Sequence, residues 1–449
     1  MKSSSRERET PAVVPEEAKQ VGERSLSIPS EPSIWTDRML SALEKGVKGN
    51  KWFSLSDKTF SVKTLTVAFQ KVETNGGSAG IDRVTIARFK ENLEVELARL
   101  SQSLMDGSYR PQAIKRVMIP KPGSKEKRPL GIPTVRDRVV QCAIRFALEP
   151  IFEKEFCDGS FGFRPGRSCH KALRRVWTGL KSGKTYVVDA DLRKCFDTLP
   201  HGFIMRGVEE RVSDGTLLNV IRLFLKQGVM QIGEGEAWEV ESTEGTPQGS
   251  VISPLLANIA LHGLDLLAES QGLELIRYAD DFVVLCRDRE SAESALAAVK
   301  AWVQASGMSL HPQKTRIVDY DAGESFEFLG YEFKKGFVYP KRKSIQKLRD
   351  KVRAETPRTS GRSLKATISK LNPILRGWYR YFRYSRPSAL RAADQFVRRR
   401  LRSILGRWRG KRGFPGGQDN NRWPNDFFYK RGLFSMEQAH KLKAQSSTR

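Results

Sequence analysis

Cysteine is scarce in this 449-residue sequence and forms no recognisable metal-binding or disulfide pattern. The five cysteines are Cys142, Cys157, Cys169, Cys195 and Cys286, an odd number without a CxxC pair. Disulfide frameworks and zinc modules need paired or closely spaced cysteines. Their absence argues against both classes and favours a reducing compartment such as the cytoplasm.

Long apolar runs are missing as well. The sequence has no stretch of about 18 consecutive apolar residues, the length that a transmembrane helix requires. The N-terminal MKSSSRERET carries charge but is not followed by the apolar segment of a secretory signal. Residues 1–34 are rich in Ser, Glu and Pro, and we expect a flexible leader there. We therefore expect no association with a membrane.

Acidic residues are depleted in the last quarter of the chain. Residues 341–449 contain 30 Lys/Arg and six Asp/Glu, a net charge of +24, out of +27 for the whole sequence. Many basic tails are solvated and disordered. This one also contains Trp378, Tyr379, Tyr381, Phe382, Trp408, Trp423, Phe427, Phe428 and Tyr429. Arginines interleaved with aromatic residues are typical of a folded nucleic-acid-binding surface, because charge binds phosphates and rings stack on bases.

The hydrophobic pattern divides the chain into segments. Residues 35–114 show a helical pattern, residues 115–340 mix short strands with helices in an α+β arrangement, and residues 341–440 are basic and mainly helical. Residues 441–449 form a tail. Two predicted strands cover Arg116–Pro120 and Tyr186–Asp191.

Two predicted helices have informative boundaries. One begins at Ser253-Pro254, where Ser253 is expected to cap the helix and Pro254 to occupy its first turn; Gly263 weakens the prediction for its second half. The other covers residues 364–382. Its apolar positions are Leu364, Ile368, Leu371, Leu375, Trp378 and Phe382, and Arg376, Arg380 and Arg383 follow about 100° around the helix.

Pro373 lies within this second pattern. Either it kinks one helix, or Asn372 caps a new helix that begins there. The second interpretation is favoured.

The most unusual short stretch is LIRYADDFVVLC at residues 275–286. Runs rich in β-branched and aromatic residues on both sides predict a hairpin with Asp280 and Asp281 at its tip. An isolated Asp-Asp pair is usually an acidic turn in water. A second acidic strand end, VVDADLRKCFDT at residues 187–198, changes that assessment, because two divalent cations about 4 Å apart could use both sets of carboxylates for phosphoryl transfer. Alternation places Asp189 and Asp191 on one face, so the pattern alone does not choose between them.

Several motifs together carry a family resemblance. The sequence resembles a bacterial group II intron-encoded reverse transcriptase and maturase over roughly residues 60–440. In family order the motifs are KPGSKEKRPLGIPTVRDRVVQ (121–141), FGFRPGRSCHKAL (161–173), DADLRKCFDT (189–198), TPQGS with SPLLANIAL (246–261), RYADD (277–281), HPQKT (311–315), FEFLGYEF (326–333) and LNPILRGWYRYF (371–382).

The resemblance implies roles for individual residues. Asp191, five residues before Phe196, would join Asp280 and Asp281 as catalytic ligands of two Mg²⁺ ions. Phe196 would be the steric gate that excludes a 2′-hydroxyl. The nucleotide site would also include Lys121, Arg128, Gln248 and Lys314, and Lys314 would help protonate the leaving pyrophosphate. The primer grip would be Phe328, Leu329 and Gly330. RNA would contact Arg164 and Arg167, although both could be structural, and the stripe of Arg376, Arg380 and Arg383.

The implied fold is a right-hand polymerase, with fingers and an antiparallel palm sheet followed by a helical thumb called domain X. The implied partners are group II intron RNA, an RNA template with a DNA primer, dNTPs and target DNA, in the bacterial cytoplasm or nucleoid. Many relatives carry a C-terminal Cys- and His-containing endonuclease domain. Because no cysteine follows Cys286, we expect no second-strand cleavage by this chain and a primer supplied from elsewhere.

Two alternative functions stay open on the sequence. The protein could be an RNA-binding splicing cofactor without chemistry of its own. It could also be a host-adopted relative that acts in DNA repair, spacer acquisition or phage defence. The oligomeric state is not indicated.

Overall fold

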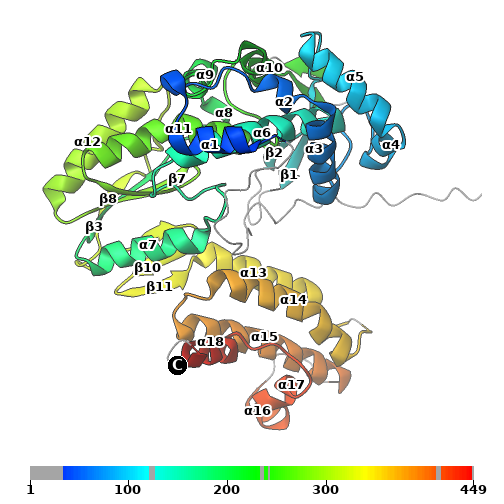
Figure 1. Ribbon diagram of the computed structural model, residues 1–449. Helices are drawn as coiled ribbons and strands as arrows, with labels where there is room; N and C mark the ends of the chain where they lie inside the picture. The colour runs from blue at the N-terminus through cyan, green and yellow to red at the C-terminus, as the bar shows by residue number, and fades with distance from the viewer. Residues whose placement is uncertain are drawn as a thin grey trace, which may run out of the picture. The chain divides into compact units, whose positions relative to one another are not determined.

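The computed structural model describes residues 34–120, 127–232, 237–240, 243–359, 361–410 and 416–446 (Figure 1). The chain forms two compact units. The first runs to Ile317, and the second begins at Val318 and includes Thr185–Val187. The predicted leader is therefore almost wholly outside the described residues, as are Lys121 and the end of the tail.

The N-terminal part of the first unit is helical, as the sequence predicts. It contains α1 (Asp37–Lys45), a 3₁₀ turn (Lys48–Asn50), α2 (Ser56–Thr59), α3 (Val62–Asn75), α4 (Ile86–Glu91) and α5 (Leu93–Met105). Thr36, Ser61 and Thr85 cap α1, α3 and α4 with side-chain oxygens that accept backbone N–H bonds. Helix α3 ends at Gly76, whose φ of +65° suits glycine.

A four-stranded sheet follows, in the order β2-β1-β4-β5. Its strands are β1 (Ile114–Pro120), β2 (Lys127–Ile132), β4 (Val229–Ile232) and β5 (Ala237–Val240). Strand β1 confirms the prediction over Arg116–Pro120 and pairs antiparallel with β2. The long helix α6 (Val135–Glu155) comes next in the chain, and most of its residues are buried.

A second four-stranded sheet has the order β6-β7-β3-β8. Its strands are β3 (Tyr186–Asp191), β6 (Glu274–Tyr278), β7 (Asp281–Cys286) and β8 (Arg316–Asp319). Strand β3 has the predicted bounds. The associated helices are α7 (Cys169–Lys181), α8 (Cys195–Thr198), α9 (His201–Glu209), α10 (Gly215–Lys226), α11 (Ser253–Ser270) and α12 (Arg289–Ala305).

Helix α11 corrects one sequence prediction. Pro254 occupies the first turn as expected, but Ile252 is the N-cap residue, and Ser253 does not cap the helix. The Ser253 hydroxyl instead donates to the Pro247 carbonyl at 3.1 Å. The helix continues past Gly263, where the missing side chain leaves room for the Trp302 ring, which would lie 3.2 Å from a Cβ at this position.

The second unit contains a three-stranded sheet and a helical bundle. The strands are β9 (Phe326–Phe328), β10 (Tyr331–Lys334) and β11 (Phe337–Pro340). The helices are α13 (Arg342–Glu355), α14 (Leu364–Phe382), α15 (Pro387–Trp408), α16 (Gly417–Arg422), α17 (Asn425–Tyr429) and α18 (Met436–Ser446). The strands belong with the helices because the Tyr331 ring packs on Phe382, with centroids 5.0 Å apart.

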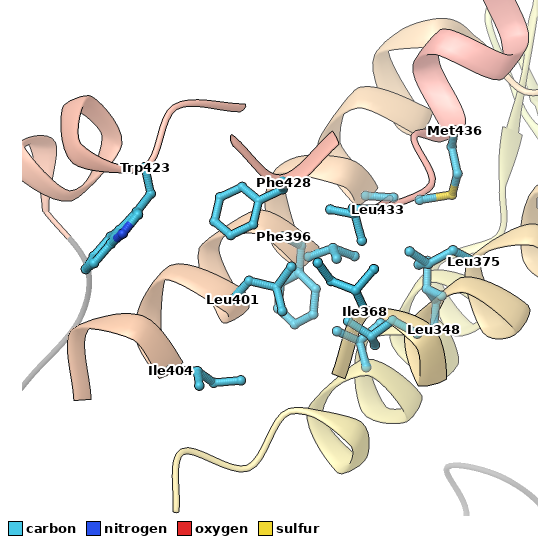
Figure 2. Close-up of a cluster of buried hydrophobic side chains, with 14 of the residues drawn as sticks. Leu348, Ile368, Leu375, Phe396, Leu401, Ile404, Trp423, Phe428, Leu433 and Met436 are labelled. Carbon is cyan, nitrogen blue, oxygen red and sulfur yellow. The ribbon is translucent and has the colours of Figure 1, made fainter. Parts of the chain in front are cut away.

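The helices of the second unit enclose their own hydrophobic core (Figure 2). Leu371 and Leu375 of α14 are fully buried, together with Leu401 of α15, Phe428 of α17 and Met436 of α18. The apolar stripe predicted for residues 364–382 is therefore the packed face of α14. No helix in the described part of the chain is long and apolar enough to cross a membrane.

Helix α14 is continuous through Pro373, so the prediction of a new helix capped by Asn372 is wrong. A proline leaves the carbonyl four residues earlier without its helical donor. Here both Ser369 and Pro373 are exposed, so water can satisfy that group. Asn372 bonds to the C-terminal segment instead: its Nδ2 donates to the Gly432 carbonyl at 2.8 Å, and its Oδ1 accepts from the Phe434 N–H at 2.9 Å.

Candidate active site

The acidic pair lies at a tight hairpin, as predicted. Arg277 pairs with Phe282 and Tyr278 with Asp281, which leaves Ala279 and Asp280 as the two turn residues. Tight hairpin turns need a residue with positive φ, usually Asn or Gly. Ala279 takes that role with φ +59° and is 7% exposed.

The structure distinguishes between the two acids of β3. Both Asp189 and Asp191 are half-buried, as alternation predicts. Asp189 faces Arg316, whose Nε lies 3.7 Å from its Oδ2. Asp191 lies close enough to Asp280 for its charge, after burial itself, to raise the pKa of the Asp280 carboxyl. Asp191 is therefore the strand acid that the fold brings to the hairpin tip.

Two cations offset this local negative charge. Arg128 of β2 and Lys314 both act to lower the pKa of Asp280, against the larger effect of burial. The Lys314 ammonium also forms an ion pair with the Asp191 carboxylate. The Asp191 carbonyl accepts from the His311 N–H at 2.8 Å, which fixes the HPQKT segment beside β3. Lys314 and Arg128 are thus at the acidic site, whereas Lys121 falls outside the described residues.

Phe196 lies in the short helix α8, just after β3. The Thr246 N–H donates to the Phe196 carbonyl at 2.6 Å, and the Gly131 N–H donates to the Gln248 carbonyl at 2.7 Å. The Gln248 side chain reaches the Asp197 carboxylate at 3.4 Å. The TPQGS loop therefore connects strand β2 to the residue predicted as steric gate.

Sequence reasoning missed Phe163, which also contacts this site. Its ring lies edge-on to Phe196, with centroids 6.5 Å apart, and 6.3 Å from the ring of Tyr278. The preceding Gly162 lies so close to the hairpin turn that an added Cβ would be 2.2 Å from the Ala279 nitrogen. Glycines at positions 159 and 162 were the available signal, since glycine marks close backbone approach.

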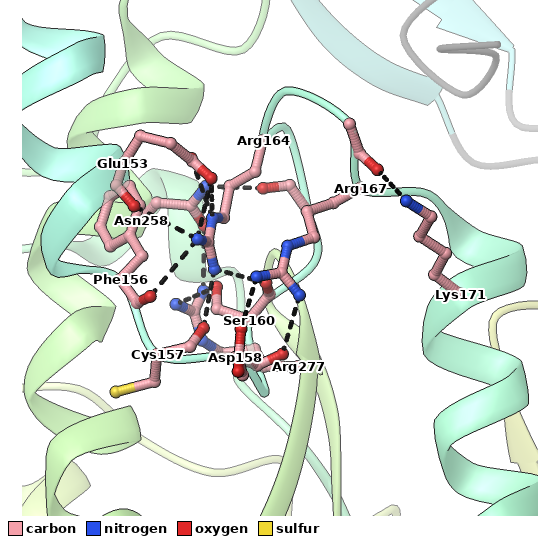
Figure 3. Close-up of polar contacts among 12 residues, drawn as sticks. Glu153, Phe156, Cys157, Asp158, Ser160, Arg164, Arg167, Lys171, Asn258 and Arg277 are labelled. Atoms are coloured by element: carbon pink, nitrogen blue, oxygen red, sulfur yellow. Dashed lines mark hydrogen bonds and ion pairs between the residues drawn. The ribbon is translucent and has the colours of Figure 1, made fainter. Parts of the chain in front are cut away.

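The two arginines of FGFRPGRS have different environments (Figure 3). Arg164 is 4% exposed; it donates to the Glu153 carboxylate and to the carbonyls of Cys157 and Ser160, both at 2.7 Å. Its donors are used internally, which supports the structural alternative for Arg164 over the predicted RNA contact. Arg167 is partly exposed and pairs with Asp158 at 2.6 Å, and its RNA contact stays a prediction.

Comparisons with known proteins identify the family. Residues 119–333 match the reverse transcriptase (RNA-dependent DNA polymerase) family, and residues 345–418 match the group II intron maturase-specific domain. Protein YkfC of Escherichia coli (strain K12) is 33% identical over 331 residues, which cover 65% of this chain and 83% of YkfC. The chain belongs to the group II intron-encoded reverse transcriptase and maturase family.

Other relatives in this family are longer. The group II intron-encoded protein LtrA of Lactococcus lactis subsp. cremoris is 41% identical over 202 residues, 44% of this chain and 32% of LtrA. An uncharacterized 91 kDa protein in the cob intron of Schizosaccharomyces pombe is 36% identical over 207 residues, 45% of this chain and 24% of that protein. The matched region thus spans about a third or less of these two relatives.

A cation is chemically suited to the acidic site of this family member. The donors are carboxylate oxygens, which Mg²⁺ prefers. Burial raises the pKa of Asp280, so a bound cation would stabilise its charged form. Among the described residues, no group of three or more His, Cys, Asp or Glu side chains is arranged to hold a metal.

In the second unit, the residues predicted as the family's primer grip lie at the end of β9 and in the turn before β10. Phe328 is buried, and Leu329 and Gly330 have φ of +49° and +78°. The Leu329 carbonyl accepts from the Tyr381 hydroxyl at 2.8 Å. Their contact with a primer stays a prediction.

The basic stripe on α14 carries aromatic partners. Arg376 lies over the Phe434 ring at 4.6 Å, and Arg383 lies over Tyr384 at 5.3 Å. Arg376 and Arg380 are exposed and Arg383 is half-buried. Guanidinium groups stacked on rings still present N–H donors at their edges, so the stripe suits phosphate binding.

Proposed function

We propose that this chain is an RNA-directed DNA polymerase that also binds its group II intron RNA as a maturase, promoting splicing and intron mobility by target-primed reverse transcription. One observation carries the polymerase assignment. Asp191 ends strand β3, Asp280 lies in the turn between β6 and β7, and the two carboxyl groups interact beside Arg128 and Lys314. Carboxylates surrounded by exposed cations are suited to a triphosphate with its counter-ions.

In this proposal Asp191, Asp280 and Asp281 hold two Mg²⁺ ions, which, when bound, would activate the primer hydroxyl and stabilise the leaving oxygen. Arg128 binds the triphosphate. Lys314 exchanges its ion pair with Asp191 for the pyrophosphate and supplies a proton to it. Phe196 lies under the sugar and excludes a 2′-hydroxyl, which selects dNTPs over NTPs.

We further propose a right-hand layout for the chain. The sheet β6-β7-β3-β8 is the palm, the sheet containing β1 and β2 belongs to the fingers, and helices α13–α18 form the thumb or domain X. The second unit supplies the RNA-binding surface, with its α14 stripe and its net positive charge. Target DNA, the RNA template and the DNA primer would be bound in the bacterial cytoplasm or nucleoid.

Substitution of an acid tests the polymerase assignment. Asp281→Ala should abolish cDNA synthesis in a primer-extension assay while intron splicing assisted by the protein continues, because splicing uses binding alone. Asp189→Ala is the matched control: it lies on β3 but faces Arg316, so it should retain synthesis. Synthesis by Asp281→Ala would contradict the catalytic assignment. Loss of splicing in a folded Asp281→Ala protein would contradict the separation of the two functions.

The RNA surface is tested through salt dependence. Replacing Arg376, Arg380 and Arg383 with Gln should weaken intron-RNA binding and reduce the slope of log K against log[salt] by up to about two or three. The control replaces three exposed cations that lie in α12 or just before it, namely Arg287, Arg289 and Lys300. It should leave the slope unchanged. An unchanged slope in the α14 variant would place the stripe away from the RNA.

A further inference from the structure

Arg277, directly before Tyr278 in RYADD, is a charged side chain with 0% exposure. A guanidinium has five N–H donors, and a buried one is costly unless they are all satisfied. Here every donor has a partner. Nε donates to Asp265 Oδ1 at 2.7 Å and Nη2 to Asp265 Oδ2 at 2.5 Å and Ser160 Oγ at 2.9 Å. Nη1 donates to Asn258 Oδ1 and to the Ala279 carbonyl, both at 3.0 Å.

These partners come from three parts of the first unit. Asp265 and Asn258 lie on the buried face of α11, Ser160 lies in the loop before FGFRPG, and Ala279 is the first turn residue of the acidic hairpin. Asn258 continues the network, since its Nδ2 donates to the Gly162 carbonyl at 2.6 Å. The view in Figure 3 shows Arg277 and Asn258 beside this loop. One side chain thus links the hairpin turn to the helix and loop behind it.

Stability alone does not account for this arrangement. A buried ion pair adds little net stability compared with a well-packed apolar pair. What an apolar pair lacks is the directed bond to the Ala279 carbonyl, which is adjacent in the chain to Asp280. The turn contains no glycine, and its shape depends on an alanine with positive φ, a conformation disfavoured for residues with a side chain. The Arg277 bond holds the turn in that conformation from inside the core.

We propose that Arg277, anchored by Asp265 and Asn258, is a positioning residue that fixes the Ala279–Asp280 turn and hence the placement of the two hairpin acids. This inference rests on the proposed polymerase function. Arg277 touches neither substrate nor metal in this role. It acts through the backbone, so its loss lowers the rate of the chemical step more than the binding of nucleotide.

Arg277→Lys tests the proposal. Lysine keeps the charge opposite Asp265, but a single ammonium cannot bond to Asp265, Asn258, Ser160 and the Ala279 carbonyl together. Two measurements are compared with wild type: single-turnover dNTP incorporation on an RNA template, and hydrogen exchange of the amides in residues 275–286. We expect the rate at saturating dNTP to fall about 100-fold while the KM for dNTP changes by less than about threefold. Exchange at the turn should accelerate.

Arg138→Lys is the matched control. Arg138 is also buried and donates to the backbone carbonyls of Gly76 and Ser78 at 3.3 and 2.6 Å, which are not part of the network around the Ala279 turn. It should lower thermal stability comparably to Arg277→Lys and leave both the saturating rate and exchange at residues 275–286 near wild type. Equal losses of rate in the two variants would assign Arg277 a purely structural role and overturn the proposal.

The remaining outcomes are separable. If wild-type protein incorporates no dNTP, the proposed polymerase function fails. If wild type is active and Arg277→Lys keeps the wild-type rate and turn protection, the positioning role fails. If Arg277→Lys does not fold, Asn258→Ala carries the same test. It keeps the Arg277–Asp265 pair but removes the acceptor of Arg277 Nη1 and the donor to the Gly162 carbonyl. It should then show faster turn exchange and a reduced saturating rate, and wild-type values for both would overturn the proposal.

Discussion

Gly162 offers a test of the hairpin's support from the opposite side. Its φ is not positive, so an alanine there meets no backbone strain, and the effect of substitution comes from the added methyl group alone. An added Cβ would lie 2.2 Å from the Ala279 nitrogen and 2.9 Å from the Tyr278 carbonyl carbon. Both are backbone atoms, which cannot rotate away as a flexible side chain could. Gly162→Ala must therefore displace the FGFRPG loop, the hairpin turn, or both.

The structure sets the size of the displacement. Ordinary contact for a Cβ begins at 3.4 Å, so the two backbones must separate by about 1 Å from the 2.2 Å position. Overpacking of this kind destabilises a protein by about 1–3 kcal/mol. A misplacement of about 1 Å near reacting groups lowers a rate by about 100-fold. We expect Gly162→Ala to fold at 25 °C with a reduced melting temperature and to incorporate dNTP about 100-fold more slowly at saturation.

The control is Gly202→Ala in helix α9, where an added Cβ meets open space. It should be neutral or stabilise the fold by about 0.5–1 kcal/mol, because alanine favours helix, and it should leave incorporation unchanged. Thermal melts and single-turnover incorporation on one RNA template measure both effects. A Gly162→Ala protein with the wild-type rate would refute the argument that the FGFRPG loop supports the acidic turn.

Three further predictions follow from contacts in the two units. Phe163→Ala removes an edge-on ring from Phe196, so the preference for dNTP over rNTP should fall by up to about tenfold in competition assays, an aromatic pair being worth about 0.5–1.5 kcal/mol. Leu371→Ala opens the core of the second unit and should reduce its unfolding free energy by about 2–5 kcal/mol in urea titrations. Burial lowers the pKa of His262 below its usual 6.5, and the nearby carboxylates of Asp265, Glu155 and Glu210 oppose this shift without cancelling it. As the pH is lowered below 6.5, the unfolded chain therefore takes up this proton before the folded chain does, and the free energy of unfolding should decrease. The decrease should be less steep in His262→Gln.

Local sequence pattern predicted the elements well where side chains repeat with a clear period. The bounds of β3 follow from a short run of β-branched residues, and the apolar stripe over residues 364–382 is the buried face of α14. The errors lie where a distant partner decides the local structure. Asn372 resembles a cap but bonds to residues 432 and 434, and Ser253 resembles a cap but bonds to Pro247.

The candidate site was predictable at the level of residue type but not of partners. Two acidic strand ends indicated a divalent-cation site, yet Asp189 and Asp191 share a face, and only their neighbours Arg316 and Lys314 distinguish them. These neighbours are more than 100 residues away in sequence. Phe163 and the internal role of Arg164 were hidden for another reason: the Arg164 partners Glu153, Cys157 and Ser160 are close in sequence, but burial and hydrogen-bond partners depend on how the loop packs, which no local period records.

The site therefore combines a fixed and an adaptable half, and this division follows its chemistry. On the buried side of the acids, the backbone at Gly162 lies directly against the backbone of Tyr278 and Ala279. All five N–H donors of Arg277 are also used there, so the hairpin cannot shift without losing buried hydrogen bonds. On the solvent side of the acids, Arg128 and Lys314 are exposed. The ion pair of Lys314 with Asp191 can therefore be exchanged for a phosphate at a small cost in free energy. Carboxylates that must hold a cation need fixed positions, whereas cations that receive and release a triphosphate need freedom to move. Substitutions behind the hairpin should therefore lower the saturating rate, and substitutions of Arg128 or Lys314 should also raise the KM for dNTP.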